Sequence, residues 1–231
     1  MSKISDFILV GTVNLRTYFY LSLLKNMNIR LENVLIYQNT EFNLDSMAGE
    51  SISLLGYTVN LNESFRSLCT FHQAKFIDCT SINEMGEILR PYVDKYILFS
   101  GKGIVKASLT DGFSLIHIHP GKLPKYRGST TVYYSLLLED NITASAFFME
   151  QGIDTGRIIY ELSIGGEKII QYSIDYLVDP MIRAVVLVRL LLNFQKEGKL
   201  TSKKQQANNE RTYYKIHPVL RHIVQRKTKS I

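Results

Sequence analysis

The sequence predicts an α/β fold: a Rossmann-like, doubly wound and mostly parallel sheet flanked by helices, with a short C-terminal extension. In the first 115 residues, short apolar runs of strand length alternate with helical patterns. These runs are continuously apolar, which is typical of parallel strands buried on both faces. With 231 residues and 45% hydrophobic side chains, the chain can bury such a core without disulfides or a metal.

The elements of this first part follow one another in a regular order. The predicted strands are residues 7–10, 33–37, 75–78, 96–100 and 115–119. Gly11 ends the first strand, and a helix is expected over residues 15–27. Ser81 and Glu84 have the spacing of a capping box and predict another helix start. Residues 39–73 show few caps and stay unassigned.

After residue 115 the pattern changes. A helix is predicted over residues 129–139 and two strands over residues 142–149 and 157–162, with a glycine-containing turn between the strands. Asp179 as N-cap and Pro180 at the first helical position predict the start of a long apolar helix. This part therefore differs from the repeating strand–helix pattern before it.

The basic charge is concentrated at the C-terminus. Residues 195–231 hold ten Lys or Arg and two Glu, a charge of +8, whereas the preceding residues hold 17 basic and 19 acidic side chains, a charge of −2. We expect a main domain over residues 1–197 and a basic extension over residues 198–231. The extension either holds phosphates or RNA by Coulomb attraction or is a solvated surface.

Cysteine usage and hydropathy predict a cytoplasmic protein. Cys69 and Cys79 are the only cysteines and form no CxxC pair, which is typical of a reduced compartment. The apolar run near the N-terminus is too short for a signal peptide. The apolar stretch over residues 181–194 carries two arginines and is shorter than the ~20 residues that cross a bilayer. No membrane association is expected.

Two histidines and an aspartate are the candidate reactive residues. His117 and His119 point to the same face at the carboxyl end of a predicted strand, which is the edge where open α/β sheets bind ligands. Histidine exchanges protons near neutral pH, and Asp154, in a turn with two glycines, is the candidate carboxylate. The histidines could instead be structural, and His-x-His with an Asp also has the ligand types of a metal site.

These residues lie in a longer pattern. IHIHPGKLPKYRG, followed by IDTGRII, resembles the two-part signature of the folate-dependent formyltransferases, and the match spans residues 95–162. That family includes glycinamide ribonucleotide transformylase, methionyl-tRNA formyltransferase and the sugar N-formyltransferases. The resemblance implies the formyltransferase fold, with the catalytic domain over residues 1–197. It also implies transfer of a formyl group from 10-formyltetrahydrofolate to an amine, without a metal.

The resemblance also implies roles for individual residues. His119 corresponds to the catalytic histidine and Asp154 to the catalytic aspartate, while His117 stands where the family has asparagine. The residues expected to contact the folate are Leu98, Phe99, Ser100, Gly101, Gly103 and Ile104 on one side, and Gln151, Gly152 and Ile153 on the other. His117 can replace asparagine as a donor in the right tautomer. A catalytically degenerate binding protein is the alternative.

The acceptor amine is inferred by exclusion. Gly11 and Asn14 lie in a strand–helix turn that could hold a phosphate, and Lys125 and Arg127 lie beside the expected site. The C-terminal extension is shorter than the domain with which methionyl-tRNA formyltransferases grip tRNA. We therefore expect a small-molecule acceptor, the amino group of a nucleotide-linked amino sugar, and no nucleic acid. Glycinamide ribonucleotide and aminoacyl-tRNA remain alternatives, and a homodimer remains open.

Overall fold

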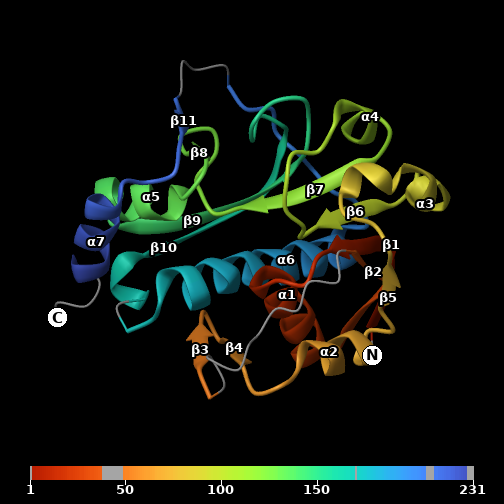
Figure 1. Ribbon diagram of the computed structural model, residues 1–231, viewed down its shortest axis with the longest axis horizontal. Helices are drawn as coiled ribbons and strands as arrows, with labels where there is room; N and C mark the ends of the chain where they lie inside the picture. Colours follow the sequence, from red (N-terminus) through yellow and green to blue (C-terminus); the bar gives the residue numbers. More distant parts are fainter. Residues whose placement is uncertain (1, 38–48, 170, 207–210, 228–231) are drawn as a thin grey trace. The chain divides into compact units, whose positions relative to one another are not determined.

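The computed structural model describes residues 2–37, 49–169, 171–206 and 211–227 (Figure 1). Contacts divide the chain into two compact units, Met1–His117 and Ile118–Ile231. Each unit is described by itself.

Parallel strands form the sheet of the first unit. In spatial order they are β5 (Lys75–Ile77), β2 (Ile29–Tyr37), β1 (Ser2–Gly11), β6 (Tyr96–Phe99) and β7 (Ser114–His119). All four pairs of neighbours are parallel. Strand residues such as Phe7, Leu9 and Ile97 are fully buried. The predicted parallel sheet is confirmed, and each predicted strand forms, with β1 and β2 longer than expected.

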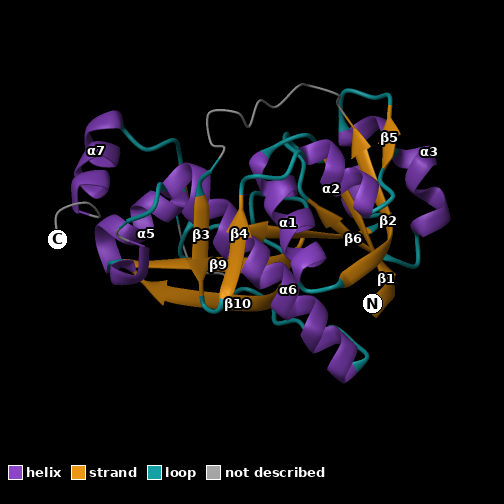
Figure 2. Ribbon diagram, turned by 90° about the horizontal axis from the view of Figure 1, so that it is seen from below, coloured by secondary structure: helices purple, strands orange, loops and turns teal. Residues whose placement is uncertain are grey.

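Helices and one hairpin complete the first unit. They are α1 (Leu15–Asn26), β3 (Ser51–Leu54), β4 (Tyr57–Asn60), α2 (Phe65–Phe71), the 3₁₀ turns Ile82–Glu84 and Arg90–Tyr92, α3 (Gly86–Leu89) and α4 (Ala107–Thr110). Figure 2 shows α1 and α2 side by side. The part of the unassigned stretch from residue 49 onward thus holds an antiparallel hairpin and a helix, and residues 39–48 lie outside the described residues.

The predicted capping box at Ser81 forms only a single 3₁₀ turn. The Ser81 hydroxyl accepts a hydrogen bond from the Asn83 N–H at 3.2 Å. The Glu84 carboxylate accepts from the Thr80 N–H at 3.1 Å and not from Ser81. Each bond is therefore displaced by one residue from the capping-box pattern, and α3 begins only at Gly86.

The second unit combines an antiparallel pair with helices. Its elements are β8 (Arg127–Gly128), α5 (Thr131–Glu139), β9 (Asn141–Phe148), β10 (Ile158–Gly165), the 3₁₀ turn Gly166–Ile169, the π-helical turn Ile174–Val178, α6 (Asp179–Glu197), β11 (Thr212–Tyr213) and α7 (Pro218–Lys227). β9 pairs antiparallel with β10, and α6 packs against both strands (Figure 1). The predicted helix and strand pair after residue 128 are confirmed.

The prediction that Asp179 is the N-cap of the long helix is wrong. The π-helical turn runs directly into α6, so Asp179 already has helical angles (φ −58°, ψ −53°). Its carboxylate instead accepts from Arg183 one turn later, with Oδ1 2.6 Å from Nε. Aspartate here neutralises a buried arginine, a role that the local sequence pattern did not indicate.

The described part of the C-terminal extension is hydrogen-bonded to the rest of the second unit. β11 pairs in parallel with β8, and α7 lies beside α5 (Figure 1). Lys203 pairs with Glu161 at 3.0 Å and Lys227 with Asp140 at 3.1 Å, while Arg221 pairs with Asp175. The predicted division at residues 197 and 198 stays a prediction, but several basic side chains of the extension have acidic partners.

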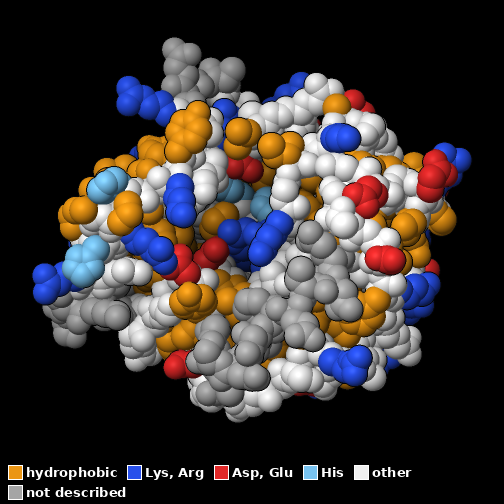
Figure 3. All heavy atoms as spheres, viewed as in Figure 1, with side chains coloured by type: hydrophobic (Ala, Val, Ile, Leu, Met, Phe, Trp, Pro, Cys, Tyr) orange, Lys and Arg blue, Asp and Glu red, His pale blue; other side chains and the backbone are white. Residues whose placement is uncertain are grey.

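The surface shows the same mixing of charges. On the face in Figure 3, Lys and Arg side chains are dispersed among hydrophobic and acidic ones. None of the helices among the described residues is both long enough and apolar enough to span a bilayer.

Gly11→Ala should destabilise the protein by about 1–3 kcal/mol, because it overpacks a closed corner. A Cβ there would collide with the Ser100 hydroxyl and lie 2.9 Å from Thr17 Oγ1. These two hydroxyls are hydrogen-bonded to each other at 2.8 Å, so neither moves away without loss. Denaturant unfolding measures the change. Gly86→Ala is the control, since its nearest atom would be 3.9 Å away; equal effects of the two substitutions would contradict this account.

Candidate functional site

His119, at the end of β7, has a fixed ring orientation. The side chain is 3% exposed. Its Nε2 lies 2.7 Å from the carbonyl oxygen of Tyr126 and 3.2 Å from the Thr131 hydroxyl. The Thr131 hydroxyl donates to the carbonyl of Pro120 at 2.8 Å, so towards His119 it acts as an acceptor. Two acceptors therefore face Nε2, and Nε2 carries the proton of the neutral ring.

The other ring nitrogen faces a carboxylate. Nδ1 of His119 lies 3.4 Å from Oδ2 of Asp154, a contact slightly longer than a good hydrogen bond. The Gly128 N–H donates to the same Oδ2 at 2.8 Å. Because Nε2 keeps its proton, the proton that comes and goes is the one on Nδ1, beside Asp154. The signature histidine and aspartate thus lie in contact, with Nδ1 as the ring nitrogen at which a proton could be exchanged.

Burial controls the protonation of this pair. Removal from water lowers the pKa of His119 below its ordinary value, because the charged ring is disfavoured in the interior. The Asp154 carboxylate opposes this shift, and the Arg183 guanidinium adds to it. A histidine with a lowered pKa is neutral at physiological pH and ready to take up a proton.

Arg183 holds the strand from the helix side. It is 6% exposed, and its Nη1 donates to the carbonyl of Ile118 at 2.9 Å. Its Nε and Nη2 bond the two carboxylate oxygens of Asp179 at 2.6 and 3.2 Å. A buried guanidinium is tolerated only when it is paired and hydrogen-bonded in this way. The sequence pattern marked Arg183 only as a charge within an apolar helix.

The loop after β7 closes tightly around the histidine. A Cβ on Gly121 would lie 2.7 Å from both His119 Nε2 and the Tyr126 carbonyl oxygen, so glycine is required there. The Ser145 hydroxyl donates to the Gly121 carbonyl at 2.7 Å and links the loop to β9. The loop is therefore a rigid support for the ring.

His117 belongs to the first unit and has a different environment. It is partly exposed, and its Nδ1 lies 3.2 Å from the carbonyl oxygen of Phe99. Since a carbonyl only accepts, Nδ1 of His117 is a donor. A ring whose neutral proton is held on Nδ1 must gain a second proton before Nε2 can donate as well.

The segment predicted to contact the folate begins in β6. Leu98, Phe99, Ser100 and Gly101 are buried, and a Cβ on Gly101 would collide with the Tyr37 hydroxyl. Gly103 has a φ of +95° and open space where a Cβ would lie, and Ile104 is 89% exposed. Asn83 fixes this end of the segment, because it donates to the Ile104 carbonyl at 2.9 Å. The folate role of these residues stays a prediction.

The second predicted folate segment, Gln151, Gly152 and Ile153, is exposed in the second unit. Gly152 has a φ of +129°, which favours glycine, and Ile153 is 60% exposed. An exposed apolar side chain beside a catalytic candidate is compatible with a flat ligand. This role also stays a prediction.

The residues predicted to bind the acceptor all have partners within the chain. Asn14 is the N-cap of α1: it accepts from the Thr17 N–H at 3.0 Å and donates to the Ser100 carbonyl at 3.0 Å. Gly11 is buried beside Ser100, and Lys125 forms an ion pair with Glu139. Arg127 donates to Gln205. Acceptor binding by these four residues stays a prediction.

Two residues of the site were not identified from the sequence. Thr131 contacts His119, and Gln205 contacts the turn of Asp154 through two carbonyl oxygens. Gln205 lies in a polar stretch without periodicity, so no local signal marks it. Among the described residues, no group of three or more His, Cys, Asp or Glu side chains gathers as a metal site would require.

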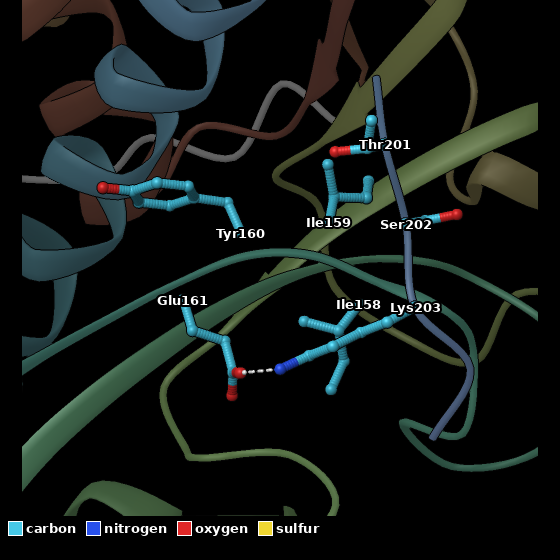
Figure 4. A pocket seen from close by; sticks show the side chains of 7 residues that line it. All are labelled: Ile158, Ile159, Tyr160, Glu161, Thr201, Ser202 and Lys203. Atoms are coloured by element: carbon cyan, nitrogen blue, oxygen red, sulfur yellow. Dashed lines mark hydrogen bonds and ion pairs between the residues drawn. The ribbon is translucent and has the colours of Figure 1, made fainter. Parts of the chain in front are cut away.

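A cavity of about 520 Å³ lies along β10 in the same unit (Figure 4). It is lined by Ile158, Ile159, Tyr160, Glu161, Thr201, Ser202 and Lys203. The Lys203–Glu161 ion pair lies at its wall. Neither His119 nor Asp154 lines this cavity.

Sequence comparisons find methionyl-tRNA formyltransferases. The chain is 30% identical over 120 residues to that of Finegoldia magna, covering 49% of this chain and 37% of the relative. It is 28% identical over 148 residues to that of Campylobacter jejuni, covering 63% and 46%. The chain therefore spans less than half the length of these curated relatives. No family model matches it.

Structure comparisons find sugar N-formyltransferases. A 4-N-formyltransferase from Francisella tularensis superposes with a TM-score of 0.60 at 18% identity, covering 96% of this chain and 87% of the other. An N-formyltransferase from Helicobacter canadensis, solved with folinic acid and dTDP-3-aminofucose, gives 0.52 at 17% identity, covering 91% and 71%. At identities this low, the superpositions show a shared fold and nothing about the substrate. Together, the comparisons confirm the predicted resemblance and the predicted formyltransferase fold.

Asp154→Asn should lower the pKa of His119 further, because the substitution removes the carboxylate that favours the charged ring. An NMR titration of the His119 ring measures this shift. Asp140→Asn is the control, since Asp140 is exposed and paired with Lys227. An unchanged His119 titration in Asp154→Asn would show that the two side chains are not coupled.

Proposed function

We propose that this chain, a relative of the folate-dependent formyltransferases in sequence and in fold, transfers the formyl group of 10-formyltetrahydrofolate to an amine. The observation that carries the proposal is the contact between His119 and Asp154. The two side chains come from the two separate parts of the signature, and they meet with Nδ1 and Oδ2 3.4 Å apart.

The chemistry requires a proton acceptor and a donor. When an amine attacks a formyl carbon, negative charge develops on the formyl oxygen and the amine nitrogen must lose a proton. Asp154 is the more accessible member of the pair, at 15% side-chain exposure against 3% for His119. In our proposal Asp154 accepts the amine proton as the new bond to the formyl carbon forms, and it shares that proton with Nδ1 of His119. The same proton then passes to the folate nitrogen as the bond from that nitrogen to the formyl carbon breaks, so that tetrahydrofolate leaves and the His119–Asp154 pair is restored. General base catalysis of this kind contributes about 10²–10⁴-fold.

Stabilisation of the developing charge is assigned to His117. Its partly exposed ring stands where the family has an asparagine donor, and a well-placed donor contributes about 3–4 kcal/mol. His119 is less suited, because its Nε2–H already donates to the Tyr126 carbonyl. Since Nδ1 of His117 donates to Phe99, the ring donates from Nε2 only in its doubly protonated form.

Each of the two predicted folate segments has features that suit a flat co-substrate. In the first unit, Gly103 lets a planar ring approach the backbone without a Cβ, and Ile104 is an exposed apolar side chain. In the second unit, Ile153 is also exposed and apolar. In our proposal 10-formyltetrahydrofolate is the substrate that supplies the formyl group, and the folate role of each segment stays a prediction.

For the acceptor we propose the amino group of a nucleotide-linked sugar. The Helicobacter canadensis structural neighbour was solved with dTDP-3-aminofucose, and the Francisella tularensis neighbour is a 4-N-formyltransferase. The second candidate acceptor is methionyl-tRNA, which is favoured by the sequence relatives. A direct comparison of the two acceptors decides between these candidates.

The wild-type protein should form tetrahydrofolate and an N-formyl product from 10-formyltetrahydrofolate and a dTDP-linked 3- or 4-amino sugar. His119→Ala and Asp154→Asn should each lower kcat about 10²–10⁴-fold, because each removes one half of the proton-exchanging pair. Release of tetrahydrofolate, followed by absorbance, measures the rate, and calorimetry with a stable 10-formylfolate analogue measures donor binding.

Lys122→Ala is the control, since this exposed lysine lies on the loop that follows His119. Turnover with methionyl-tRNA alone would reassign the acceptor. Saturable folate binding without turnover of any amine would identify a binding protein, and the catalytic proposal would be wrong.

His117→Asn should remain active, because an amide, like the imidazole, can donate a hydrogen bond to the reacting oxygen. His117→Ala has no donor and should lower kcat about 10²–10³-fold. The formyl-transfer assay measures both variants. Equal rates of His117→Asn and His117→Ala would show that His117 does not donate to the reacting oxygen.

A further inference from the structure

Gln205, in the segment that follows α6, uses the full hydrogen-bonding capacity of its side chain. Its Nε2 donates to the carbonyl oxygens of Asp154 at 2.8 Å and Gly156 at 2.7 Å. Its Oε1 accepts from Nη2 of Arg127 at 2.7 Å and from Nε at 3.2 Å. A primary amide has two donors and one oxygen with two lone pairs, and all of them are used here.

These bonds join the two parts of the signature. Arg127 begins β8, at the end of the loop that follows His119, while Asp154 and Gly156 belong to the turn between β9 and β10. Gln205 itself comes from the C-terminal extension, 51 residues after Asp154. One side chain therefore ties together three segments that are distant in sequence.

The turn that Gln205 holds needs support. Asp154 has a φ of +54°, in the left-handed region that a residue with a Cβ occupies only at some cost. Gly156 is pressed against β9, because a Cβ there would collide with the carbonyl of Phe148. Two hydrogen bonds to the carbonyls of this turn favour the left-handed conformation and thereby fix the direction of the Asp154 carboxylate.

The segment that carries Gln205 is anchored close by. Lys203 and Ile158 exchange two backbone hydrogen bonds, each 2.9 Å long. The Lys203 side chain adds an ion pair with Glu161 at 3.0 Å (Figure 4). The backbone two residues before Gln205 is therefore hydrogen-bonded to β10, which limits how far Gln205 can move.

The C-terminal extension also supports the carboxylate group of Asp154, through β11. The Gly128 N–H donates to Asp154 Oδ2 at 2.8 Å, and β11 pairs with Gly128 through Tyr213. The Tyr213 carbonyl also accepts from the Ser129 N–H at 2.8 Å. Thus Gln205 fixes the backbone of Asp154, while β11 supports the donor to its carboxylate.

We propose that Gln205 is a positioning residue that holds the Asp154 carboxylate against His119 for proton exchange. The inference rests on the proposed role of Asp154. Glutamine suits the position because its neighbours are two acceptors on one side and a guanidinium on the other. Leucine has a similar volume but forms none of these bonds, and glutamate would place an oxygen against two carbonyls.

Gln205→Leu and Gln205→Glu test the proposal, with Gln206→Ala as the matched control, since Gln206 is the next residue and is exposed. Both Gln205 variants should lower kcat about 10–100-fold, as expected when a reacting group shifts by about 1 Å. KM for the amine and the folate should change less than threefold. The His119 ring should titrate at lower pH than in the wild type, because the carboxylate that favours its charged form moves away. Gln206→Ala should match the wild type.

The two variants also separate misfolding from misplacement. Thermal unfolding shows whether each variant is folded, and only folded variants are compared. A folded Gln205→Leu or Gln205→Glu protein with wild-type kcat and wild-type His119 titration would overturn the proposal. If the wild-type protein has no formyltransferase activity, the proposed function fails, and the NMR titration still decides whether Gln205 sets the His119–Asp154 contact.

Discussion

The described structure of the second unit depends on one buried contact, between the ring of His119 and the carboxylate of Asp154. Both groups are expensive to bury, since each prefers water in its charged form. Hydrogen-bonding partners within the chain offset this free-energy cost. The Tyr126 carbonyl and the Thr131 hydroxyl face one ring nitrogen, and the Gly128 N–H faces the carboxylate. Proton exchange is thereby confined to the one remaining position, Nδ1.

A second buried charge lies close to this pair and is handled differently. Arg183 donates hydrogen bonds to the Asp179 carboxylate and to the Ile118 carbonyl. The Asp179 carboxylate balances the charge of the guanidinium. Its field still disfavours a charged His119, which contributes to the lowered pKa of the ring. The two pairs therefore form one electrostatic arrangement, in which burial and the Arg183 guanidinium lower the pKa of His119 and the Asp154 carboxylate opposes them.

The basic C-terminal extension stabilises the second unit, a role that its composition did not indicate. Its charge alone indicated a solvated surface or a site for phosphates. In the structure, Arg221 and Lys227 pair with acidic side chains of the second unit, β11 supports the signature loop and Gln205 holds the Asp154 turn. The ion pairs depend on which acidic side chain lies nearby, and the other two contacts depend on a neutral amide and on backbone groups, so a count of charges indicates none of them.

The sequence by itself determined the strands of the parallel sheet, the β9–β10 pair and the helices α1, α5 and α6, because apolar runs and helical periodicity are local properties. It also indicated His119 and Asp154 through the resemblance of a long two-part pattern. It did not determine the β3–β4 hairpin and α2. It was wrong about the Asp179 cap, since the preceding turn continues the helix, and it could not indicate Thr131 or Gln205. Only the tertiary structure decided which nitrogen of His119 exchanges its proton and what holds Asp154. The physical reason is that these contacts join residues 7 to 78 positions apart, whose meeting no helix or strand periodicity encodes.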